Sequence, residues 1–70
     1  MNDLFIVVGV RIAQHRILLN LSQEELAELA HVSRNFVGYV ERAERRPSIK
    51  TLLRIAKALN ISLEELFKDF

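Results

Sequence analysis

The 70-residue sequence contains no cysteine, one proline and two glycines. The lack of cysteine excludes disulfides and thiolate metal sites, and no acidic cluster stands near His15 or His31 to complete another kind of metal site. We therefore expect no metal and no cofactor. An alternating apolar–polar pattern is also missing, which favours helices over strands. A chain of this size forms one domain, residues 1–70, and buries only about 60% of its unfolded surface. Helix packing and self-association must then supply its stability.

Long apolar runs are missing too. The run Leu4-Phe5-Ile6-Val7-Val8 is too short to span a bilayer, and no positive segment or small-residue cleavage site marks it as a signal peptide. We expect a cytoplasmic protein with no membrane partner. An enzyme is not expected, because no nucleophile stands near a general base and there is no glycine-rich phosphate loop. No small-molecule ligand is expected either, since no second domain is present to hold one.

The net charge of +1 is unevenly distributed. Residues 34–57 carry seven lysines and arginines against two glutamates, a balance of +5, whereas residues 1–33 and 58–70 each have a balance of −2. A basic middle segment is typical of a surface that binds a polyanion. On charge alone, a solvated and charge-laced helix face explains it equally well.

Start and stop signals divide the chain into five predicted helices, at about residues 4–19, 22–30, 33–42, 48–59 and 62 onward. Ser22 with Glu25, and Ser62 with Glu65, form the pattern of a capping box. Asn20 and Asn60 are placed to end helices, because asparagine tolerates the left-handed conformation found there. Only about three residues separate the second and third helices, and so short a connection predicts a helix-turn-helix.

Several segments carry a family resemblance. They are Leu21-Ser22-Gln23-Glu24-Glu25-Leu26-Ala27, Val32-Ser33-Arg34, Val40-Glu41-Arg42, Pro47-Ser48-Ile49 and residues 51–59. Together they resemble the phage-repressor and Cro-like (XRE) helix-turn-helix family over about residues 9–67. The resemblance implies an all-α fold, a compact five-helix, lambda-repressor-like domain that binds double-stranded DNA and regulates transcription. Arg34-Asn35-Phe36 is, more narrowly, similar to the controller proteins of restriction–modification systems.

The resemblance also implies roles for the third helix, residues 33–42, as the recognition helix. Ser33, Arg34, Asn35 and Tyr39 match positions that meet base edges. Arginine can fork two donors onto guanine and asparagine can bridge adenine, while Tyr39 is expected to touch a thymine methyl or a phosphate. Phe36 is either a core residue or an apolar base contact.

Other positions are implied to contact the DNA backbone or to hold the helices together. Gln23, at the start of the second helix, matches a residue that faces a phosphate, where the helix dipole adds attraction. Residues of the loop and of the fourth helix's start position the domain rather than specify sequence: Arg45, Arg46, Ser48, Lys50 and Thr51. Arg16 and Glu41 match a structural ion pair.

Two positions depart from the family pattern. His31 stands where the family has glycine, at a turn that often needs a positive φ, which histidine tolerates better than branched residues do. Gly38 lies inside the recognition helix, at a cost of about 1 kcal/mol relative to alanine. It either allows a close approach to DNA or is simply tolerated in a short helix.

The chain has more apolar residues than one core needs, which is typical of an interface. We expect a homodimer, because one recognition helix reads too few base pairs to find a unique site. The expected interface is residues 61–70 with the adjoining part of the fourth helix, and the Leu4–Val8 surface is the second choice. The candidate residues of the C-terminal interface are Ile61, Leu63, Leu66, Phe67 and Phe70. The alternative function is a protein-interaction module, such as an antitoxin, on the same fold.

Overall fold

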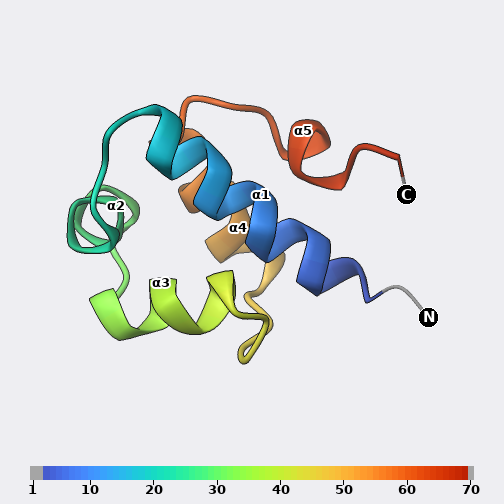
Figure 1. Cartoon of the computed structure of the whole chain (residues 1–70), viewed down its shortest axis with the longest axis horizontal. Helices are drawn as coiled ribbons and strands as arrows, with labels where there is room; N and C mark the ends of the chain where they lie inside the picture. Colours follow the sequence, from blue (N-terminus) through green and yellow to red (C-terminus); the bar gives the residue numbers. More distant parts are fainter. Residues whose placement is uncertain (1–2, 70) are drawn as a thin grey trace.

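The computed structural model describes residues 3–69 and contains five helices: α1 (Leu4–Leu18), α2 (Gln23–Ala30), α3 (Arg34–Glu41), α4 (Ile49–Ala58) and α5 (Leu63–Phe67). No strand occurs in this range. The all-α prediction and its five helices are confirmed (Figure 1). Phe70, one of the predicted interface residues, lies outside the described residues.

Each helix begins at a capping side chain. The oxygen of Asp3 accepts the backbone N–H of Phe5, and serine hydroxyls cap the other four helices in the same way, at Ser22, Ser33, Ser48 and Ser62. The predicted box at α2 is complete, because the Glu25 carboxylate also accepts the Ser22 N–H at 2.8 Å. That backbone bond, helped by the Ser22 hydroxyl, holds the pKa of Glu25 below its ordinary value. At α5 the described residues show only the bond from the Glu65 N–H to Ser62.

The helices end at residues with left-handed backbone. Asn20 and Asn60 have φ near 60°, as predicted, and His31 has φ 59° in the turn between α2 and α3. Ala43, after α3, also has φ 60°. The positive φ of Ala43 is not predictable from the sequence, because alanine has neither the flexibility of glycine nor the local hydrogen bonding of asparagine.

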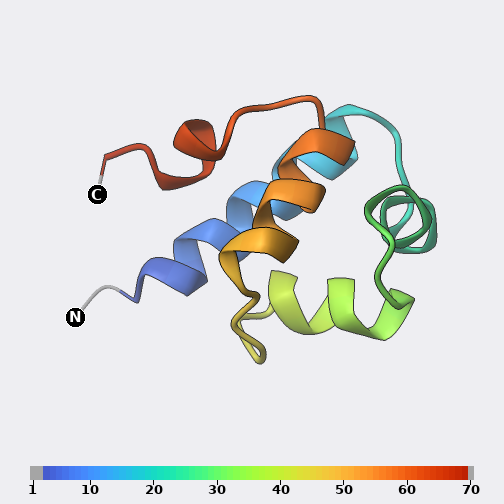
Figure 2. The same ribbon diagram turned by 180° about the vertical axis from the view of Figure 1, so that it is seen from behind.

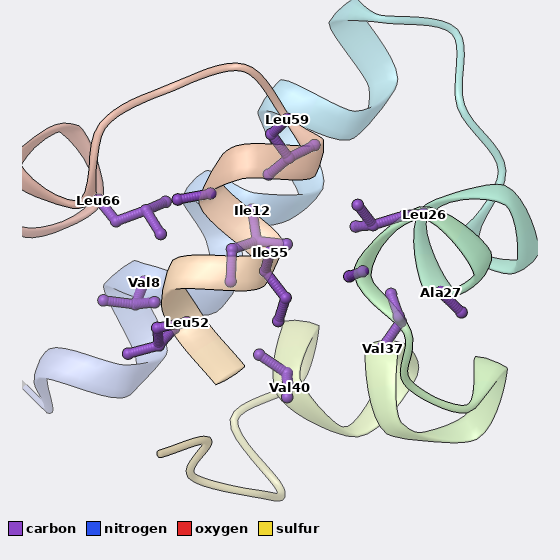
Figure 3. Packing of buried hydrophobic residues seen from close by; sticks show 12 residues of the cluster. Val8, Ile12, Leu26, Ala27, Val37, Val40, Leu52, Ile55, Leu59 and Leu66 are labelled. Carbon is purple, nitrogen blue, oxygen red and sulfur yellow. The ribbon is translucent and has the colours of Figure 1, made fainter. Parts of the chain in front are cut away.

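The core lies where side chains from all five helices meet (Figure 3). Its residues include the predicted stripe of α4: Leu52, Ile55, Ala56 and Leu59. Val8 and Ile12 of α1 face this stripe, and Val40 of α3 closes it from below in Figure 3. Leu66 is 0% exposed and belongs to this core. Its expected place in a dimer interface is therefore wrong, since a side chain sealed inside its own chain cannot touch a partner.

The helices are arranged around this core so that α3 forms one edge of the molecule. Figures 1 and 2 show α1 and α4 on opposite faces, with α2 at one end and α5 near the termini. Helix α3 packs against α1 and α2, while α5 packs against α1 and α4. Within residues 3–69 no single helix is long and apolar enough to cross a membrane, although α1 and α2 meet that criterion as a pair bent by 104°.

Gly9 sets the distance between α1 and α3. A Cβ atom built on Gly9 would lie 2.5 Å from the carbonyl oxygen of Val40 and 2.8 Å from that of Glu41. Both atoms belong to the backbone, so neither can swing away. The two helices therefore meet backbone to backbone at this point, and only glycine fits there.

Gly9→Ala should reduce the free energy of unfolding by about 3 kcal/mol, the upper end of the usual cost of overpacking. Gly38→Ala is the matched control, because its Cβ would meet only the flexible end of Arg42, at 3.1 Å. Removing a glycine from a helix interior should there raise the free energy of unfolding by about 0.5 kcal/mol. Chemical denaturation of both variants measures the two effects. Equal shifts in the same direction would contradict the close approach at Gly9.

Candidate nucleic-acid interface

The outward face of α3 carries polar side chains at its first turn, and Arg42 follows at the C-cap of the helix. Arg34, Gly38 and Arg42 are spaced four residues apart and therefore share one side of the helix. Together with Gln23, Asn35 and Tyr39 they line a hollow of about 240 Å³. Arg42 was not among the residues predicted to contact DNA. Its spacing from Arg34 is the signal that identifies it.

The opposite face of α3 holds the helix to the core. Val37 and Val40 are buried, and Phe36 is half-buried and packs against the core. Of the two roles considered for Phe36, the structure favours core packing. Arg34 and Asn35, by contrast, are exposed at the first turn of the helix. The predicted base-reading end of α3 is therefore open to solvent.

Glu41 connects the end of α3 to both α1 and α2. Its carboxylate accepts bonds from the guanidinium of Arg16, Nε to Oε2 at 2.7 Å and Nη2 to Oε1 at 3.3 Å. The predicted ion pair is confirmed, and its side chains are only 15% and 7% exposed. Arg16 also donates to the carbonyl oxygen of Leu21 at 2.8 Å. Both charges have lost most of their hydration and are compensated mainly by each other. Removing one partner would therefore leave the other charge buried and uncompensated.

Gln23 belongs to the same network, which its predicted role did not include. Its amide Nε2 donates to Glu41 Oε1 at 2.9 Å. A primary amide has two N–H donors, so one is used inside the protein and a second can serve an external acceptor. The side chain is half-buried at the border of the hollow on α3.

The two serines in the predicted DNA-contact set already have structural roles. Ser33 accepts the Phe36 N–H at 3.1 Å and caps α3. Ser48 accepts the Thr51 N–H at 3.2 Å, caps α4, and donates its proton to Thr51 Oγ1 at 3.1 Å. Both serines remain exposed at helix N-termini, where the dipole attracts anions.

The loop between α3 and α4 lies at the same edge of the molecule as α3 (Figure 1). Arg45, Arg46 and Lys50 are all exposed, whereas Pro47 between them is buried and anchors the loop. Arg42 and Arg45 each lie over the ring of Tyr39. The exposed cations of α3, the loop and the start of α4 thus form one basic edge.

Other arginines are committed to the interior of the fold. Arg54, which contributes to the basic balance of residues 34–57, donates to the carbonyl oxygen of Ala30 at 3.2 Å, at the end of α2. Arg11 donates to the carbonyl oxygens of Leu66 and Lys68 at 3.1 and 2.6 Å and ties α5 to α1. Within residues 3–69, no three histidine, aspartate or glutamate side chains are placed to hold a metal ion.

A second surface lies between α4 and α5. Leu53 is 50% exposed, and with the half-buried Ile61 and Leu63 it lines a groove of about 470 Å³. Phe67 is also half-buried and packs against the core. Figures 1 and 2 place the connection between α4 and α5 at the edge opposite α3. Apolar side chains thus remain accessible at a distance from the basic edge. At the second choice, the Leu4–Val8 surface, Val8 is buried and Ile6 is exposed.

Comparisons with known proteins agree with this geometry. A model of the helix-turn-helix family matches residues 12–66. The control protein C.SmaI of Serratia marcescens is 41% identical over 64 residues, which cover 91% of this chain and 76% of that protein.

Two solved structures are similar over nearly the whole chain. The restriction-modification controller protein C.AhdI from Aeromonas hydrophila has a TM-score of 0.87 and 41% identity, covering 90% of this chain and 96% of that one. The P22 c2 repressor, solved in complex with a synthetic operator, has a TM-score of 0.84 and 33% identity, covering 91% and 97%.

Glu41→Ala should lower the free energy of unfolding by roughly 3 kcal/mol, because it leaves the guanidinium of Arg16 buried without its partner. Glu44→Ala is the matched control, since the Glu44–Arg42 pair is exposed and such pairs contribute at most about 1 kcal/mol. Thermal and chemical denaturation of the two variants provide the comparison. A Glu41 variant as stable as the Glu44 variant would show that the network does not hold α3.

Proposed function

The chain belongs to the helix-turn-helix family, and we propose that it is a DNA-binding transcriptional regulator that inserts α3 into the major groove of double-stranded DNA. The observation that carries the proposal is the division of α3 into two faces. Val37 and Val40 fix the helix to the core, while Arg34 and Asn35 stand exposed at its first turn. A helix held in this way can present side chains to base edges in the major groove.

The relatives support a narrower role. One relative with 41% identity is named a control protein, and a solved structure with 41% identity is that of a restriction-modification controller protein. We infer that this chain regulates such an operon. The repressor that was solved with a synthetic operator supports DNA as the ligand.

We assign the reading of bases to Arg34 and Asn35, by bidentate bonds to guanine and adenine respectively. Tyr39 borders the same hollow. The second amide N–H of Gln23 is assigned to a phosphate. The remaining backbone contacts are assigned to the loop and the start of α4, at Arg45, Arg46, Ser48, Lys50 and Thr51, with Ser33 at the start of α3.

We further infer that the protein acts as a homodimer on an inverted repeat. One recognition helix contacts only a few base pairs, and a twofold pair doubles these contacts at half-sites about 34 Å apart. The surface between α4 and α5, with Leu53, Ile61 and Leu63, is our candidate for the interface. It combines these apolar side chains with Lys57, Asn60 and Ser62, and it leaves α3 uncovered.

Arg34→Ala should separate base reading from backbone binding. On a duplex selected from a random pool we expect a loss of about 1–3 kcal/mol, with much less change on random-sequence DNA. The matched variant Lys50→Ala should weaken binding to both duplexes equally and reduce the slope of log K against log[salt] by about 0.9. Titrations at several salt concentrations measure both. Equal losses of affinity for Arg34→Ala on the two duplexes would show that Arg34 contacts a phosphate and not a base. Affinity that does not depend on salt would refute the proposed mode of DNA binding.

Leu53→Glu should convert the dimer into a folded monomer, because it places a charge in the candidate interface without disturbing the core. Specific DNA binding should weaken by roughly 100-fold or more, since the advantage of two linked half-sites is lost. Ile6→Glu is the control, because Ile6 is equally exposed, at 53%, on α1. Sedimentation and circular dichroism report the oligomeric state and the fold. If the Leu53→Glu variant remains a dimer and the Ile6→Glu variant becomes a monomer, the interface lies on α1 and the assignment to α4 and α5 is wrong.

A further inference from the structure

Three arginines at the end of α3 and in the following loop lie against aromatic rings. The guanidinium carbons of Arg42 and Arg45 lie 5.6 and 5.5 Å from the centre of the Tyr39 ring. That of Arg46 lies 5.2 Å from the centre of the Phe5 ring, on α1. These distances fall within the range of cation–π attraction. Two rings therefore hold three of the cations of the basic edge.

Two of these arginines also meet a carboxylate. Arg42 Nη2 lies 3.2 Å from Glu44 Oε1, and Arg46 Nη2 lies 3.1 Å from Asp3 Oδ2. Both pairs are exposed, with more than a third of each side chain accessible to solvent. Exposed pairs of this kind are weak and are easily exchanged.

The two kinds of contact use different parts of the guanidinium group. A ring attracts the flat face of the cation, whereas the five N–H donors point outward in its plane. An arginine on a ring therefore keeps its donors for an anion. A phosphate oxygen can take the place of a carboxylate oxygen at these donors while the ring contact stays as it is.

We propose that Tyr39 and Phe5 are platforms that hold Arg42, Arg45 and Arg46 in position for the phosphates of DNA. Glu44 and Asp3 occupy the phosphate positions of Arg42 and Arg46 in the free protein. DNA binding then exchanges two carboxylate contacts for phosphate contacts. The inference rests on the proposed function and adds Arg42, Phe5 and the two acids to the residues that determine backbone affinity.

The role of the platform is tested by comparing Tyr39→Phe with Tyr39→Leu, using a short duplex of random sequence so that base reading makes no contribution. Phenylalanine keeps the ring and loses only the hydroxyl, so its affinity should stay within about twofold of the parent. Leucine removes both cation–π contacts and should weaken binding about three- to tenfold, the change that such contacts at exposed sites imply. Equal losses for the two variants would assign the effect to a hydroxyl contact with DNA and overturn the platform role. No loss for leucine would overturn it as well.

The carboxylate exchange is tested with Asp3→Asn and Glu44→Gln on the same duplex. Asparagine still caps a helix as well as aspartate does, so α1 keeps its start. Each variant should bind about two- to fivefold more tightly than the control Glu64→Gln, which removes the same charge from α5, away from the basic edge. Affinities no greater than that of the Glu64 variant would overturn the exchange.

These outcomes remain distinct from failure of the proposed function. A parent protein that binds no duplex at all would refute DNA binding itself. A parent protein that binds with a steep salt dependence, but whose Tyr39, Asp3 and Glu44 variants behave like their controls, would refute only the platforms and the exchange. Circular dichroism and melting curves establish that each variant is folded.

Discussion

The position of α3 depends on the close contact between α1 and the end of α3. Gly9 brings the backbone of α1 against the carbonyl groups of Val40 and Glu41. Seven residues further along α1, Arg16 donates a hydrogen bond to the Glu41 carboxylate, which also accepts one from Gln23 of α2. The hydrophobic effect has no preferred direction, whereas these hydrogen bonds require a defined distance and angle. The cation of Arg16 also lies at the C-terminal end of α3, where the helix dipole favours positive charge. The orientation of α3 relative to the core is thereby fixed by contacts with both α1 and α2.

The arginines of this chain divide between two tasks that net charge does not distinguish. Arg11 and Arg54 donate to backbone carbonyl oxygens near the ends of α5 and α2, where the helix itself leaves acceptors unsatisfied. Arg16 donates to the carbonyl oxygen of Leu21, in the connection between α1 and α2. The arginines of α3 and its loop stay in solvent at one edge. The basic balance of residues 34–57 therefore overstates the cations available to a polyanion, because Arg54 is committed to the fold. What supports the proposal that this edge binds DNA is the grouping of its cations on adjoining elements.

Features with local causes were predictable from the sequence, whereas among features with distant causes the Arg16–Glu41 pair was anticipated only through the family resemblance. The serine caps and the left-handed asparagines act within four residues of the helix end that they define, so all five helices could be placed. The bond from Gln23 to Glu41 joins residues 18 apart and left no local signal. Leu66 was misplaced because α5 has only five residues, too few for a helical period to show which apolar side chain points inward. Ala43 was missed because its left-handed backbone is imposed by the connection from α3 to the loop and not by its own side chain.

In the proposed mode of DNA binding, sequence reading and DNA affinity are assigned to parts of the structure that differ in rigidity. Arg34 and Asn35 stand on a helix that the core and the Glu41 network hold from behind, so their reach toward base edges is set by the fold. The loop arginines are held by ring contacts and exposed ion pairs, each a weak interaction. In the proposed complex, such weak contacts would let these cations follow the phosphates as the local shape of the duplex changes, because little energy is lost in moving them. If α3 reads the bases and residues 42–46 contact the phosphates, as proposed, substitutions in residues 42–46 would change affinity while the specificity of α3 stays the same.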